Sequence, residues 1–118
     1  MTASRLDLGR TGESAALATY EARGYRLVAR NWRCRLGEVD LVVRRATLLV
    51  FCEVKARRGS RFGAPFEAVH ATKQRKLRSL AEVFLGSYGD AVTAVRFDVA
   101  SVTVRGGRAH VHLFEDAF

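Results

Sequence analysis

Two acids and a lysine stand at unusual positions in this sequence, inside segments that are otherwise apolar. Asp40 lies in the run 39–43, and Glu53 lies near the end of the run 48–54, one residue before Val54 and two before Lys55. Both runs are rich in β-branched or apolar residues, which predicts two strands joined as a β-hairpin. Charged side chains are rare in such places unless they are paired or bind a metal.

The spacing of the two runs predicts how their side chains meet. Residues 44–47 form a short reversal, and a loop centred between Ala46 and Thr47 places Asp40 directly opposite Glu53. Opposed side chains have Cβ atoms about 4.5–5.5 Å apart, and like charges there repel. A divalent cation between the two carboxylates would remove the repulsion. Oxygen ligands of this kind favour Mg²⁺, for which Mn²⁺ is a substitute.

Lys55 projects beside such a cation, because alternate residues of a strand share a face. Its amine could orient an attacking water or withdraw a proton from it. The alternative interpretation is that Asp40, Glu53 and Lys55 are ordinary charges on a solvated sheet face, neutralised by nearby arginines.

Short motifs in a fixed order over residues 9–104 carry a further signal. They are Gly12-Glu13, Gly37-Glu38-Val39-Asp40, Glu53-Val54-Lys55, Arg57, Phe62-Gly63, Lys73 and Arg96-Phe97-Asp98-Val99. In this order they resemble the small bacterial YraN-type (UPF0102) family. That family is grouped with the restriction-endonuclease-like nucleases of PD-(D/E)xK signature, and its strand layout is similar to that of archaeal Holliday-junction resolvases.

The resemblance implies a metal-dependent endonuclease that hydrolyses phosphodiester bonds of duplex or branched DNA, with 5′-phosphate and 3′-hydroxyl ends. It implies that Asp40, Glu53 and the carbonyl of Val54 bind Mg²⁺, that Glu13 adds a third carboxylate, and that Lys55 positions the hydrolytic water. Glu13 also has an alternative reading as a first-turn acid favoured by the helix dipole. We expect Asp98 to have a structural role, paired with a nearby arginine.

The positive charge of the chain is concentrated in one segment. The net charge is +8, and residues 23–78 hold fifteen Arg or Lys against four acids. Such a segment attracts a polyanion. An arginine-rich proteome would explain why 17 of the 20 basic residues are Arg, but not their concentration. We expect DNA contacts from the loop 56–65 and the helix after it, through Arg57, Arg58, Arg61, Lys73 and Lys76.

The pattern of helices and strands expected around these residues predicts an α/β fold in one domain, residues 1–118. We expect a restriction-endonuclease-like core, a mixed central β-sheet flanked by helices in the order α-β-β-β-α-β-β. The strand after the second helix should run parallel to the one carrying Glu53. The expected elements are a helix capped by Thr11 and ended by Gly24, strands 25–32, 39–43 and 48–54, a helix from Pro65, and strands 94–104 and 109–114 joined at Gly106-Gly107.

Several classes of protein do not fit the sequence. No apolar run approaches the ~18 residues of a membrane span, and the first residues do not form a secretory signal, so we expect a cytoplasmic protein that binds no membrane. Cys34 and Cys52 lack a metal or redox spacing and are expected to be reduced; a disulfide between them is the minor alternative. Resolvase-like domains of this size generally act as dimers, which makes a homodimer a further expectation.

Two rival functions stay open at this stage. One is a catalytically silent DNA-binding module on the same fold. The other is an RNA-associated or protein-scaffolding role, although the scattered aromatic residues do not form the stacking platform that RNA readers display.

Overall fold

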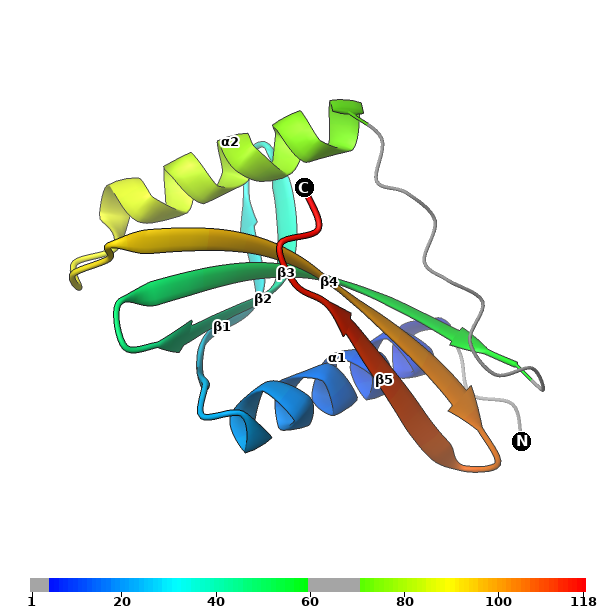
Figure 1. Ribbon diagram of the computed structural model, residues 1–118. Coiled ribbons are helices and arrows are strands. Elements are labelled where there is room, and N and C mark those ends of the chain that lie inside the picture. Colours follow the sequence, from blue (N-terminus) through cyan, green and yellow to red (C-terminus); the bar gives the residue numbers. More distant parts are fainter. Residues whose placement is uncertain (1–4, 60–70) are drawn as a thin grey trace.

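A five-stranded mixed sheet with one helix on each face forms the protein (Figure 1). The computed structural model describes residues 5–59 and 71–118. The sheet order is β1-β2-β3-β4-β5, with β3 and β4 parallel and the other neighbours antiparallel. This is the predicted α/β architecture. The elements are α1 (Arg5–Ala22), β1 (Arg26–Cys34), β2 (Gly37–Arg45), β3 (Leu48–Arg58), α2 (Ala71–Ser87), β4 (Ala94–Arg105) and β5 (Arg108–Phe114).

Two apolar cores lie on opposite faces of the sheet, and β3 contributes to both. Val50 and Cys52 pack with residues of α1, whereas Leu49 and Phe51 pack with residues of α2. The alternation of side chains along an extended strand produces this division. From the helices, the buried apolar residues are Ala16 and Tyr20 on α1 and Leu77, Leu80, Ala81 and Phe84 on α2.

The predicted register of the β2–β3 hairpin is confirmed as far as Leu41 and Cys52, where the pairing ends one residue before the predicted pair of Asp40 and Glu53. Leu41 pairs with Cys52, and the pairing continues to a two-residue turn at Ala46 and Thr47. The expected four-residue reversal is shorter because Arg44 continues β2, where its guanidinium donates hydrogen bonds to the carbonyls of Ala46 and Ala91 and to the Tyr88 hydroxyl. Ala46 has a φ of 52°, a left-handed conformation more typical of glycine or asparagine.

Helix α1 starts earlier than predicted. Thr11 lies inside the helix, so its assignment as the N-cap is wrong. The residues before it, Arg5 to Arg10, include leucine and arginine, which tolerate a helix well, and nothing there forces a break. The predicted end at Gly24 is confirmed: Gly24 has φ +88°, and the Tyr25 amide donates to the Tyr20 carbonyl at 3.1 Å, as in a Schellman motif.

The second half of the chain matches the predicted elements with shifted boundaries. Residues 56–58 were expected to begin a loop, but they pair with β4 and belong to β3. The rest of that loop, with Arg61 and the helix start at Pro65, lies outside the described residues. The predicted parallel pairing of β3 with β4 and the turn at Gly106-Gly107 are confirmed.

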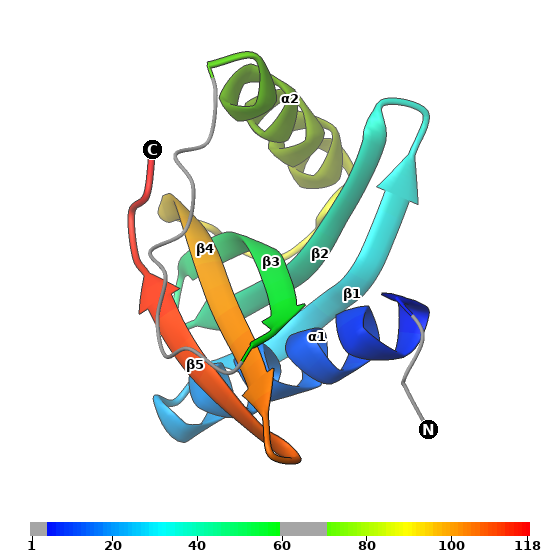
Figure 2. The same cartoon turned by 90° about the vertical axis from the view of Figure 1, so that its right-hand side faces the viewer.

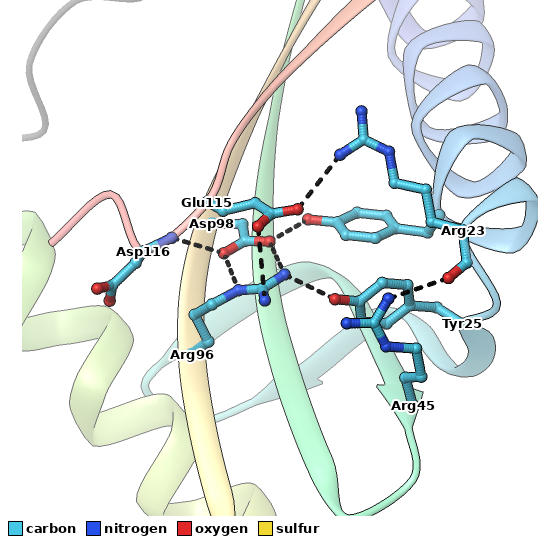
Figure 3. A network of polar contacts seen from close by, with 8 residues as sticks. Arg23, Tyr25, Arg45, Arg96, Asp98, Glu115 and Asp116 are labelled. Atoms are coloured by element: carbon cyan, nitrogen blue, oxygen red, sulfur yellow. Dashed lines mark hydrogen bonds and ion pairs between the residues drawn. The ribbon is translucent and has the colours of Figure 1, made fainter.

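A buried polar network links α1 to β4 and the end of the chain (Figure 3). Asp98 is fully buried, and its carboxylate accepts hydrogen bonds from Arg96 at 2.9 Å, from the Tyr20 hydroxyl at 2.7 Å and from the amide of Asp116 at 3.0 Å. The predicted pairing of Asp98 with an arginine is confirmed.

Two smaller expectations can also be compared with the structure. Cys34 and Cys52 are both free thiols, as predicted. In the parts of the chain that the structure covers, no helix is both long and apolar enough to cross a membrane.

Candidate metal and nucleic-acid site

Asp40 lies where two strands of the sheet separate. The β2–β3 pairing ends at Leu41 and Cys52, whereas β2 stays paired with β1 to its start at Gly37, and β3 continues beside β4. In Figure 2 the β1–β2 hairpin rises beside α2 while β3 leaves in another direction. At this fork the Asp40 Oδ2 accepts the Val54 amide at 2.8 Å, so a side chain links the strands where their main chains have parted.

Three carboxylates converge at the fork. Glu13 from α1 and Glu38 and Asp40 from β2 each offer an oxygen, and these oxygens lie within 4.8 Å of one another. Glu13 is buried, with 9% of its surface exposed, and it lies in the middle of α1. The alternative reading of Glu13 as a first-turn acid is therefore wrong; Asp7 has that position.

The fold holds Glu13 in place from two sides. Its Oε1 accepts hydrogen bonds from the side-chain amide (Nδ2) of Asn31 at 3.0 Å and from Arg30 Nε at 3.3 Å. Asn31 has a φ of 52° within β1, a conformation that asparagine tolerates better than most residues. On the helix side, Gly12 lies so close to β3 that a Cβ there would be 2.5 Å from the Ala56 Cβ. This close approach brings Glu13 to the sheet.

Glu53 completes the acidic side of the site and is held differently. Its Oε1 forms an ion pair with Lys73 at the start of α2. Its Oε2 is buried and, among residues 5–59 and 71–118, has no hydrogen-bond partner. A cavity of about 190 Å³ separates β2 and β3 from α2, with Glu38, Asp40 and Glu53 on one side and Lys73 and Lys76 on the other.

Burial is the main reason why Asp40 is hard to ionise. Burial has the largest effect, and together with the nearby charges of Glu53, Glu13 and Glu38 it raises the pKa of the Asp40 carboxyl to about 6. The hydrogen bond from the Val54 amide acts in the opposite direction and lowers this pKa. A positive charge placed among these acids would therefore favour the ionised form.

The remaining predicted site residues are placed less centrally. Lys55 is half-buried and does not line the cavity, and its side-chain amine forms no ion pair or hydrogen bond with any other described residue. Arg57 and Arg58 are exposed at the end of β3. Lys73 and Lys76 line the cavity.

Sequence reasoning missed four residues of the site. Glu38 precedes Asp40 by two residues and therefore shares its face of the strand, but no role was predicted for it. Arg30 and Asn31 could not be predicted, because nothing in the sequence of segment 25–32 indicates that its side chains reach a glutamate on the preceding helix. Arg33, whose Nε lies 2.7 Å from Glu38 Oε2, was missed for the same reason.

Comparison with known proteins places the chain among relatives of similar length. The sequence model described as uncharacterised protein family UPF0102 matches residues 12–102. The UPF0102 protein of Symbiobacterium thermophilum is 46% identical over 112 residues, covering 94% of this chain and 95% of that protein. The UPF0102 protein of Caldicellulosiruptor saccharolyticus is 38% identical over 117 residues, covering 98% and 99%. This chain therefore belongs to the UPF0102 family.

Proposed function

We propose that the protein is a metal-dependent endonuclease acting on DNA phosphodiesters. The observation that carries this proposal is the convergence of Glu13, Glu38 and Asp40 within 4.8 Å, beside a cavity lined by two lysines. Acids bind a hard cation and the lysines bind phosphate, so the site has both partners of a metal-assisted phosphoryl transfer.

The residues present fit Mg²⁺ or Mn²⁺. All the donors are oxygens, and the buried Glu53 Oε2 has no partner among the described residues, so a cation would satisfy it. Asp40 and Glu53, with the Val54 carbonyl, are the ligands that the family resemblance implies; Glu13 and Glu38 supply further negative charge. Bound there, the cation would polarise the scissile phosphate and offset the charge developing in an in-line displacement.

The chain's own side chains account for the rest of the reaction. Lys73 and Lys76 hold phosphates of the substrate on the α2 side of the cavity, which requires Lys73 to exchange its ion pair with Glu53 for one with a phosphate. Lys55 orients the hydrolytic water. Its flexible four-carbon stem allows the amine to turn toward the cavity when substrate is present.

A second candidate function is a DNA-binding module without turnover. The observation that favours it is the ion pair between Lys73 and Glu53, together with the position of Lys55 outside the cavity lining. In such a module the lysine would permanently neutralise the glutamate, and the basic surface alone would bind DNA.

The two functions are separated by a cleavage assay on linear, nicked, flapped and four-way-junction DNA with Mg²⁺, with Mn²⁺ and with EDTA. We expect metal-dependent cleavage by the wild type and a loss of at least about 100-fold in Asp40→Asn and Lys55→Ala, since each removes a group assigned to the chemistry. The exposed Asp90→Asn is the matched control and should cleave normally.

Two results would contradict the proposal that the protein is a nuclease. Equal cleavage by all three variants would assign the activity to a contaminant. Salt-dependent DNA binding without cleavage of any substrate would favour the silent module.

A further inference from the structure

The turn between β1 and β2 combines basic charge with an exposed apolar side chain. Arg35 and Leu36 form a two-residue turn between the paired residues Cys34 and Gly37. The Leu36 residue is 46% exposed, and the Arg33 side chain before the turn is 76% exposed. We call Arg33, Arg35 and Leu36 the hairpin tip. Exposure of a large apolar side chain directly after these arginines has no role in the packing of the two cores.

The hairpin tip stands next to the acidic site. Glu38, one of the three converging carboxylates, follows Leu36 by two residues, and Arg33 Nε contacts it at 2.7 Å. At about 3.3 Å of extended chain per residue, Leu36 and Arg35 lie within ~7 and ~10 Å of Glu38, because the chain reverses at these two residues. Across the cavity, Lys76 Cε would lie 2.9 Å from a Cβ on Gly37, so the hairpin and α2 approach each other there (Figure 2).

We propose that the hairpin tip is a DNA-binding element that enters a groove and places Leu36 beside a base step two or three steps from the scissile phosphate. This inference rests on the proposed function. The separation follows from the distance above, because base pairs are spaced 3.4 Å apart along duplex DNA. A two-stranded ribbon has the dimensions to enter a groove, and exposed leucines act as wedges that partly unstack bases.

Charge makes DNA the partner that fits this element. Arg35 is exposed and forms no ion pair or hydrogen bond with the other described residues, so its guanidinium can bind a phosphate. Arg33 stays paired with Glu38 and fixes the tip relative to the acids. A wedge costs least where stacking is already interrupted, so Leu36 selects duplexes with a nick, flap or junction over continuous duplex.

The test measures unstacking and affinity with the full chain. The probe is 2-aminopurine at the base step next to the break in nicked and flapped duplexes, where the wedge would act, with Ca²⁺ in place of Mg²⁺ so that the DNA stays uncut. We expect the wild type to increase the 2-aminopurine fluorescence. Leu36→Ala should lose at least half of this increase and about 3–10-fold of the preference for nicked over continuous duplex.

Matched variants control for exposure and charge. Val83→Ala changes an apolar residue of similar exposure, 44%, on α2, and it should behave as the wild type. Arg35→Gln should weaken binding to all duplexes alike and lower the slope of log affinity against log salt by about 0.9, the value for one phosphate. The exposed Arg108→Gln at the β4–β5 turn should do neither.

The outcomes distinguish this inference from the proposed function. If Leu36→Ala and Val83→Ala give the same fluorescence and affinity while the wild type cleaves DNA, the hairpin inference is overturned and the nuclease stands. If the same Leu36 dependence appears only with RNA duplexes, DNA is the wrong partner. If the wild type neither binds nor cleaves any DNA, the proposed function fails first.

Discussion

At neutral pH the Asp40 carboxylate is held ionised among three other acids, at a cost in stability. Its pKa in the folded protein is about 6, against an ordinary value of 3.8. Well below pH 3.8 the carboxyl is protonated in both the folded and unfolded chain, so there is no penalty. As the pH rises from about 3 to 6 the unfolded chain releases the proton first, and the folded state loses stability.

Asp40→Asn should therefore stabilise the metal-free protein at high pH only. At pH 8 in EDTA we expect the free energy of unfolding to rise by about 1–3 kcal/mol, given about 1.4 kcal/mol for each pH unit of pKa difference. The asparagine oxygen can still accept the Val54 amide. Urea unfolding followed by fluorescence of Trp32, the single tryptophan, measures the change.

The pH dependence is the control for this prediction. At pH 4 the gain should be much smaller, because the folded wild-type carboxyl is then neutral and the unfolded one is only partly ionised. A gain of equal size at pH 4 and pH 8 would show that packing, rather than charge, produces it. Asp90→Asn should leave the stability at both pH values unchanged within about 0.5 kcal/mol.

Among the elements, the packing of α1 on β3 decides whether the acids meet. Gly12 allows the helix to approach Ala56 closely, and Glu13 follows it directly. Gly12→Ala should push α1 away from β3 and move Glu13 from Glu38 and Asp40. We expect a fall of about 1–3 kcal/mol in stability, as in other overpacked cores, and at least 10-fold weaker Mn²⁺ binding, measured from the electron paramagnetic resonance of the free ion.

Gly9→Ala supplies a matched control on the same helix. A Cβ at Gly9 meets nothing within 4 Å, so alanine there should raise stability by up to about 1 kcal/mol through helix propensity and leave Mn²⁺ binding unchanged. Equal Mn²⁺ affinity in the two variants would contradict the assignment of Gly12 as the residue that positions Glu13.

The elements differ in how far the sequence predicts them. The β2–β3 register followed from the alternation of apolar residues around a short turn, and it correctly brought Asp40 and Glu53 toward one site. The contact between Glu13 and β2 did not follow, because it depends on the angle at which α1 crosses the sheet. Periodicity identifies the buried face of a helix but not this angle. The left-handed conformation of Asn31 could not be predicted from the sequence either, since it depends on residues that are neighbours only in space.

Across the whole molecule, the network around Asp98 connects distant segments. It joins Tyr20 of α1 and Arg96 of β4 to the amide of Asp116, and Arg96 also donates to the Tyr25 hydroxyl at 3.0 Å (Figure 3). Asp98→Ala leaves the Arg96 charge without its main partner, and we expect it to lower the free energy of unfolding by about 3–5 kcal/mol. Urea denaturation provides the measurement.

An exposed acid of the same region gives the comparison for Asp98. Glu115 forms ion pairs with Arg23 at 3.2 Å and Arg96 at 3.7 Å, but its side chain is 44% exposed. Solvent screens these pairs, so Glu115→Ala should cost less than about 1 kcal/mol. Similar losses in Asp98→Ala and Glu115→Ala would show that the buried network contributes no more than a surface ion pair.

The bond between the Val54 amide and Asp40 Oδ2 also makes that one peptide group a natural reporter. In an ordinary ladder its proton would face a neutral carbonyl, whereas here it faces an oxygen whose charge changes with acidity and with any cation nearby. The nuclear magnetic resonance frequency of the Val54 amide thus reports the ionisation of Asp40 and the binding of a cation at the fork. It requires neither an attached probe nor turnover.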